Sequence, residues 1–271
     1  GLIYTAYAQE GLNLDDDAKA TAEMILSMKE NHPAALNLLG ILAYKKGEND
    51  RAGDYFLQAV HVHPGYAEAH TNLGVLHWRR EEKDEALAEM RKGFVLSPSV
   101  PDLGALYFSA AVSLGKLSDA EQDFLDALRF HPENKNLIFL TIDLLIKQGK
   151  YREAMLRIQD ALALFGLEEG ALAAALDIRR RIGPPQIDRK TKKHPLSLCM
   201  IVKNEEKNLV KCLHSVRDLV DEIIVVDTGS TDRTKDIARI FGAKTFDFPW
   251  SGDFAAARNH SLAQATGDWV L

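Results

Sequence analysis

The chain has 271 residues, a formal net charge of −6, and a composition of 46% hydrophobic and 27% charged residues. This apolar content can bury a core, which excludes a disordered or collagen-like chain, and the acidic balance argues against a chain-wide nucleic-acid surface. The only cysteines, Cys199 and Cys212, provide no disulfide framework, so we expect a reducing compartment and a cytoplasmic protein. No apolar run is long enough to cross about 30 Å of hydrocarbon, and we expect no transmembrane segment.

The first two thirds of the chain repeat with a period of 34 residues. Small residues recur in one column, where they let two antiparallel helices approach closely, and larger apolar residues recur four positions later, where they fill the gap between units. Prolines end several units by stopping the second helix. The pattern predicts an α-solenoid of stacked helix pairs over 1–182, with 167–182 as a capping helix. The two columns are Ala52, Ala86, Ala120 and Ala154, and Phe56, Met90, Phe124 and Ile158.

These columns resemble tetratricopeptide repeats over roughly residues 33–166. The resemblance implies a concave groove, lined by the first helix of each unit, that takes a protein or peptide partner. The alternative is that the same residues only pack or solvate a scaffold. The groove positions that the resemblance assigns are Asn37, Tyr44, Lys45, Thr71, Trp78, Arg79, Phe139, Asp143 and Lys147.

Histidines are the obvious candidates for metal ligands in this half of the chain. His61 and His63 stand two apart, and His70 and His77 stand seven apart on one helix face. Zinc sites usually need three or four ligands, and no cysteine or carboxylate stands at ligand spacing beside either pair. We therefore expect no metal site there.

A basic segment, 183–194, follows the repeats and contains Arg189, Lys190, Lys192 and Lys193 against the single acid Asp188. Proline and charge keep such a segment extended, so we interpret it as an interdomain linker. Contact with an anionic membrane surface or a phosphorylated ligand is the alternative, and it leaves membrane association open.

After residue 195 the pattern changes to apolar strands that alternate with helices of 10–15 residues. Such alternation predicts right-handed crossovers and a parallel sheet. The expected strands cover 196–202, 222–227, 243–248 and 268–271, and the expected helices cover 205–217, 232–241 and 254–265.

Ligands of parallel sheets bind outside the carboxyl ends of the strands. Asn204 and Glu205 follow the first expected strand, and Asp227 and Thr228 end or follow the second. An ionised carboxylate such as that of Asp227 accepts hydrogen bonds, which suits a ribose hydroxyl or a base edge. Asp227 as a simple turn former is the alternative. No glycine-rich phosphate loop follows either strand, which excludes dinucleotide and P-loop chemistry.

Four segments in this region resemble the opening of a bacterial family 2 glycosyltransferase, in particular members like the lipopolysaccharide-core glucosyltransferases. The resemblance implies a Rossmann-like α/β domain that binds a nucleotide-diphospho-sugar, truncated here to 195–271. It also implies that Asp227 and its neighbours hold the donor nucleotide. Many members have a second aspartate where Thr228 stands, so uridine and guanosine both remain open. The segments are 197–206 (SLCMIVKNEE), 225–232 (VVDTGSTD), 253–259 (DFAAARN) and 265–271 (ATGDWVL).

The same resemblance places Arg258 near the donor phosphates, with a surface salt bridge as the alternative. The nucleotide-sugar set is therefore Asn204, Glu205, Asp227, Thr228 and Arg258. The family's metal-binding aspartate pair and general base do not occur in these residues, so we assign no catalytic residue and expect no turnover by this chain alone. A divalent metal, magnesium or manganese, is implied only for the intact domain.

Two functions follow from this organisation. In the first, the parent protein is an inverting glycosyltransferase whose repeats recruit the acceptor for the sugar. In the second, the chain is a scaffold that binds a partner protein in the repeat groove and catalyses nothing.

Overall fold

The computed structural model describes residues 1–185 and 194–271, and it divides into two compact units, Gly1–Leu144 and Leu145–Leu271. Most of the predicted basic linker, including its lysines, lies outside the described residues. The division at residue 144 reflects contacts between residues, whereas the sequence-based domain boundaries at 182 and 195 reflect the end of the repeats and the start of the strands. Those domain boundaries therefore stay a prediction.

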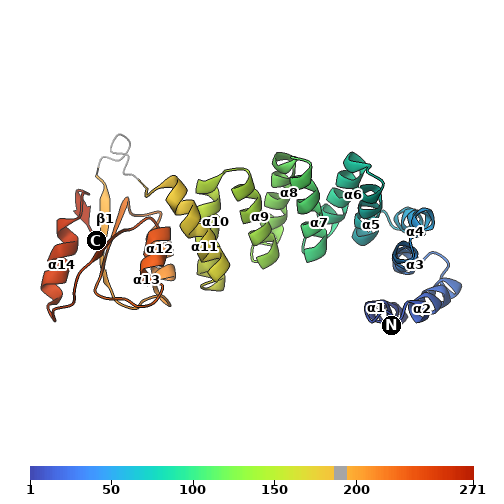
Figure 1. The fold of residues 1–271 in the computed structure, drawn as a ribbon, viewed down its shortest axis with the longest axis horizontal. Coiled ribbons are helices and arrows are strands. Elements are labelled where there is room, and N and C mark those ends of the chain that lie inside the picture. The colour runs from blue at the N-terminus through green and yellow to red at the C-terminus, as the bar shows by residue number, and fades with distance from the viewer. Residues whose placement is uncertain (186–193) are drawn as a thin grey trace. The chain divides into compact units, whose positions relative to one another are not determined.

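The first unit is built of antiparallel helix pairs, as the 34-residue period predicts (Figure 1). An additional pair, α1 and α2, precedes the repeats that are in phase. The prediction of an α-solenoid is confirmed. The helices are α1 (Leu2–Gly11), α2 (Asp15–Met28), α3 (Pro33–Lys45), α4 (Asn49–Val62), α5 (Ala67–Arg79), α6 (Lys83–Leu96), α7 (Pro101–Ser113), α8 (Leu117–Phe130) and α9 (Lys135–Lys147), the last of which reaches into the second unit.

The repeat columns lie where the sequence pattern expects them. Ala52, Ala86 and Ala120 have no exposed surface, and the larger column residues Phe56 and Phe124 are also buried. Phe124 stacks on Phe94 at 4.5 Å between ring centroids, and Phe94 in turn stacks on Tyr107 at 5.5 Å. Small residues thus bring the helices together, and stacked rings join successive pairs.

The second unit combines a helix pair, α10 (Tyr151–Phe165) and α11 (Glu169–Ile182), with a four-stranded sheet. All strand pairs are parallel and the strand order is β3-β2-β1-β4, which confirms the predicted α/β architecture. The remaining elements are β1 (Leu196–Val202), α12 (Leu209–Val216), β2 (Glu222–Asp227), α13 (Thr234–Ile240), β3 (Lys244–Asp247), α14 (Phe254–Ala263) and β4 (Trp269–Val270).

Strand order also determines which face each helix covers. The chain moves outward from β1 to β3 through α12 and α13, then returns to the other side of β1 through α14. Because crossovers are right-handed, α12 and α13 lie on one face and α14 on the other (Figure 1). The direction reverses between β1 and β4, so the loops after β1 and β2 lie beside the switch point at which such sheets bind ligands.

Candidate functional site

The loops that follow β1 and β2 are joined by side-chain hydrogen bonds. Asn204 adopts a left-handed backbone conformation with φ of 54°, its N–H donates to Ser230 Oγ at 2.8 Å, and its Oδ1 accepts from the Thr231 N–H at 2.8 Å. Asparagine tolerates this conformation better than most residues, which explains why it stands at the end of a strand. Asn204 therefore connects the loop after β1 to the loop after β2 by hydrogen bonds.

The next residues extend this link into the start of α13. The Glu205 N–H donates to Thr234 Oγ1 at 2.7 Å, and the Arg233 N–H donates to a carboxylate oxygen of Glu206 at 3.1 Å. Burial by itself would raise the pKa of Asp232, but hydrogen bonds from Thr234 and from the Glu206 N–H lower it. Asp232 is thus held as a carboxylate that joins both loops.

Asp227 lies at the carboxyl end of β2 and is 1% exposed. Its Oδ1 accepts from the N–H groups of Gly229 at 3.0 Å and Ser230 at 2.8 Å, which forms the turn. Its Oδ2 is also buried, and it has no hydrogen-bond donor among the described residues. Asp227 therefore does form the turn, but this role uses only one of its two oxygens.

Thr228 and Arg258, which are also predicted to bind the nucleotide-sugar, lie in different surroundings. The Thr228 hydroxyl and its N–H both donate to the Val202 carbonyl, at 3.1 and 2.9 Å, so Thr228 fastens β2 to β1. Arg258 is exposed on α14, whose start is capped by Asp253 through the Ala256 N–H at 3.0 Å. Within residues 1–185 and 194–271, the structure shows no ion pair for the Arg258 guanidinium. Its predicted role toward a donor stays a prediction.

In the first unit, two of the predicted groove residues are buried. The Asn37 amide donates to the Tyr7 hydroxyl at 3.1 Å and accepts from the Asn72 amide at 2.8 Å. Thr71 is buried as well, and its hydroxyl has no partner among the described residues. The Tyr7 and Asn72 contacts were not identified from the sequence. The recurrence of asparagine in successive first helices is the signal that points to Asn72.

The remaining groove residues of the first unit are more accessible. Arg79 lies over the Tyr44 ring, 5.3 Å from its centroid, and Lys83 lies 4.1 Å from the centroid of the half-buried Trp78. Lys45 forms ion pairs with Glu10 and Asp15. On α9, Phe139 is half-buried and Asp143 is exposed. Lys147, the last residue of α9, belongs to the second unit.

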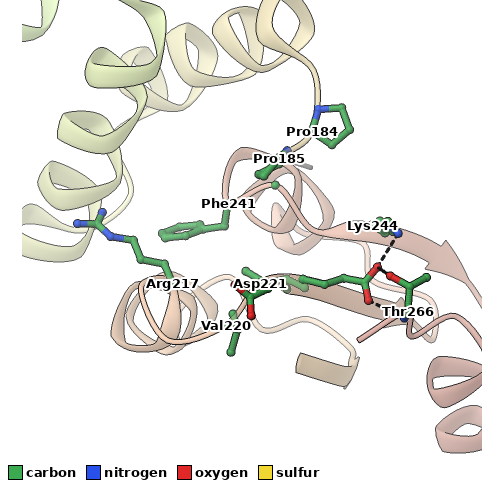
Figure 2. Close-up of a pocket in the computed structure, with 11 residues that line it drawn as sticks. Pro184, Pro185, Arg217, Val220, Asp221, Phe241, Lys244 and Thr266 are labelled. Atoms are coloured by element: carbon green, nitrogen blue, oxygen red, sulfur yellow. Dashed lines mark hydrogen bonds and ion pairs between the residues drawn. The ribbon is translucent and has the colours of Figure 1, made fainter. Parts of the chain in front are cut away.

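A cavity of about 330 Å³ lies at the amino ends of β2 and β3, the edge opposite Asp227 (Figure 2). Glu222 at this edge is buried, and its carboxylate accepts from Lys244 at 2.5 Å and from the Thr266 hydroxyl at 2.9 Å, the contacts drawn as dashed lines (Figure 2). It also accepts from the Ser197 hydroxyl at 2.5 Å. The carboxylate has four donors, including the Thr266 N–H, so its role is structural.

The described residues meet neither the requirements of a metal site nor those of a membrane span. Among the described residues, no three histidine, cysteine, aspartate or glutamate side chains come together as metal ligands would. The divalent metal that the resemblance implies for the intact domain stays a prediction. Within residues 1–185 and 194–271, every helix is too short or too polar to cross a bilayer.

Comparison with known proteins assigns families to the two regions. Residues 197–271 match a model of glycosyl transferase family 2, and residues 16–61 and 37–101 match a tetratricopeptide repeat model. The chain thus joins tetratricopeptide repeats to a glycosyltransferase family 2 domain, as its motifs predict.

Individual relatives agree with this assignment. A tetratricopeptide repeat-containing protein of Synechococcus elongatus is 58% identical over 76 residues, which cover 28% of this chain and 19% of that protein. An uncharacterized glycosyltransferase of Rickettsia typhi is 40% identical over 76 residues, 28% of this chain and 26% of that protein. The prophage-derived glycosyltransferase SunS of Bacillus subtilis is 43% identical over 79 residues, 26% of this chain and 17% of that protein. The matches thus span at most about a quarter of these relatives, and they support a glycosyltransferase in general terms.

Solved structures show the repeat fold. The pilF structure of Pseudomonas aeruginosa has a TM-score of 0.51 at 18% identity, covering 70% of this chain and 85% of that one. A structure of Naa15/Naa10 bound to HypK-THB has a TM-score of 0.52 at 14% identity, covering 67% of this chain and 29% of that one. At such identities the likeness concerns the fold alone.

Proposed function

We propose that the second unit binds the nucleotide part of a nucleotide-diphospho-sugar, as the donor half-site of a glycosyltransferase. The observation that carries this proposal is the buried Asp227 Oδ2 at the carboxyl end of β2, which has no hydrogen-bond donor in the part of the chain that the structure describes. A buried acceptor without a partner costs free energy, and a ligand hydroxyl or N–H would remove that cost. The loops after β1 and β2, which hydrogen bonds of Asn204 connect, would hold this acceptor in place before the ligand binds.

Titration calorimetry with uridine and guanosine diphosphates tests the donor site. Asp227→Asn keeps an oxygen that can accept from Gly229 and Ser230, so the turn survives while the charge and the second acceptor are lost. We expect about 10- to 100-fold weaker binding, the scale of losing a hydrogen bond to a charged group. Comparing the two nucleotides also tests which base is accepted.

Asp247→Asn is the matched control, because Asp247 ends β3 in register with Asp227 but is exposed and paired with Lys235 at 3.1 Å. Its affinity should equal that of the wild type. Equal affinity in the Asp227→Asn variant would remove Asp227 from the donor site, and no nucleotide binding by the wild type would favour the scaffold function.

We further propose that the repeats bind a protein or peptide partner that presents the acceptor. The Tyr44–Arg79 contact and the half-buried Trp78 support this, since tryptophan, tyrosine and arginine dominate binding energies at protein interfaces. A Trp78→Ala, Arg79→Ala double variant should lose most of a specific partner in pull-down experiments. Phe130→Ala, which removes an exposed aromatic side chain from a second helix, should not. Equal recovery by the double variant would contradict the proposal.

A further inference from the structure

The short helix α13 follows directly from the loop that begins after Asp227, the last residue of β2. It has seven residues, Thr234–Ile240, and is therefore about 10 Å long. Isolated helices of this length are unstable in water, and their last carbonyl groups need partners from elsewhere. The position of α13 thus depends on what packs against it.

Side chains of the α10–α11 pair supply those partners at the end of α13. The Gln159 amide on α10 donates to the Ile240 carbonyl at 2.9 Å, and the Arg179 guanidinium on α11 donates to the same oxygen at 2.8 Å. Arg179 also donates to the Gly183 carbonyl at 2.9 Å. A cation at a helix carboxyl terminus is favoured by the helix dipole, so this contact holds α13 firmly.

The beginning of α13 contacts the same helix pair. Arg233, immediately before α13, forms an ion pair with Glu169 at the start of α11 at 3.2 Å. The Arg233 N–H donates to Glu206, in the loop after β1. Helix α11 therefore contacts α13 at both ends, and one of these contacts is continuous with the loops of the donor site.

A second connection from α10 reaches α12. Asp160 pairs with Arg217 at 2.6 Å and with His214 at 3.0 Å, and Arg217 points toward α10 in Figure 2. The helix pair is thus fastened to both helices on one face of the sheet. The contacts of Gln159 and Arg179 with the Ile240 carbonyl are buried or half-buried, and such contacts are specific in geometry. The Arg233–Glu169 ion pair is exposed.

We propose that Arg179 and Gln159 are positioning residues for the loop after β2, residues 228–233, and that they act through α13 from the helix pair α10 and α11. This inference rests on the proposed donor site. The two side chains fix the carboxyl end of α13. Thr234, the first residue of α13, donates hydrogen bonds to Asp232, which lies in the loop that follows Asp227. The last helix pair is in this sense part of the glycosyltransferase domain.

The test uses the 271-residue chain with two readouts, the affinity for uridine and guanosine diphosphates and hydrogen exchange of the amides of residues 228–234. Arg179→Ala and Gln159→Leu should each weaken nucleotide binding about 3- to 30-fold and speed exchange in this loop. Arg179→Lys, which keeps a cationic donor, should recover part of both. Arg181→Ala is the control, because Arg181 lies on the same helix but pairs with Asp177 and Tyr151.

The outcomes separate this inference from the donor-site proposal. Unchanged exchange and unchanged affinity in Arg179→Ala and Gln159→Leu would overturn the positioning role. Faster exchange in a chain whose wild type binds neither nucleotide would support the positioning of the loop and overturn the donor site. An equal effect of Arg181→Ala would show general destabilisation, and the positioning role would then be wrong.

Discussion

Replacing Glu222 with glutamine is expected to lower the free energy of unfolding of the second unit by about 3 kcal/mol at pH 7. Burial by itself would raise the pKa of Glu222, but hydrogen bonds from Lys244, Ser197 and Thr266 outweigh burial and lower it from 4.5 to about 2. A difference of this size between folded and unfolded chain corresponds to about 3 kcal/mol. Glutamine also places an amide N–H₂ group against donors, which leaves some of them unpaired.

The pH dependence follows from the direction of this shift. Because the folded pKa lies below the unfolded one, the carboxylate contributes its full stability above about pH 4.5, and the contribution disappears as the pH falls toward 2. The wild type should therefore lose stability faster than Glu222→Gln between these values, and the two unfolding energies should converge.

Urea unfolding in a Trp78→Phe background measures the difference, because the remaining tryptophans, Trp250 and Trp269, lie in the second unit. Glu153→Gln, at an exposed position on α10, is the control and should change the unfolding energy by less than about 0.5 kcal/mol. A Glu222→Gln variant as stable as the wild type at pH 7 would contradict the structural role of this carboxylate.

Replacing Gly93 with alanine is expected to destabilise the first unit by about 2–3 kcal/mol. A Cβ on this residue of α6 would lie 2.0 Å from Thr71 Oγ1 and 2.8 Å from the Ala67 carbonyl oxygen. The two helices would have to separate, and overpacking of this kind costs about 1–3 kcal/mol or more. Alanine's higher helix propensity offsets about 1 kcal/mol of the cost.

A double variant identifies the clash as the cause. Thr71→Ala removes the closest atom, a hydroxyl without a partner among the described residues, so Gly93→Ala should cost less in that background. The Ala67 carbonyl contact remains and should keep part of the cost. Gly11→Ala, where nothing lies within 4 Å of the added Cβ, should cost little. Urea unfolding followed by the fluorescence of Trp78, in a chain that carries Trp250→Phe and Trp269→Phe, measures all four variants. Equal costs of Gly93→Ala with and without Thr71→Ala would contradict this explanation.

Periodicity alone predicted most of the fold. The 34-residue spacing of Ala52, Ala86 and Ala120 marks the closest approach of paired helices, because only small residues fit there. The continuous apolar run of β2 predicts a strand covered on both faces, and all six of its residues are buried. Strand–helix alternation then places Asp227 at the carboxyl edge, since a parallel sheet brings all these ends together.

Tertiary contacts decided what individual polar residues do. Glu222 is the charged first residue of a predicted strand, and the sequence names no partner for it. In the structure its carboxylate accepts hydrogen bonds from β1, β3 and the turn before β4. The Thr228 hydroxyl donates a hydrogen bond to the Val202 carbonyl, and the buried Asn37 amide donates one to the Tyr7 hydroxyl. These hydrogen-bond partners are between 22 and 44 residues apart in the chain, so no local sequence pattern indicates them.

Long-range contacts also explain why the last helix pair, α10 and α11, belongs to the second unit. Sequence period groups α10 and α11 with the repeats, because their alanine and apolar columns, Ala154 and Ile158, continue the same spacing. Contacts group them with the sheet, because Gln159 and Arg179 meet the Ile240 carbonyl 81 and 61 residues away. The sequence by itself determined which faces are apolar and which residues lie at strand ends. Only the folded structure decided which hydrogen-bond donor pairs with which acceptor, because that pairing depends on segments that packing brings together.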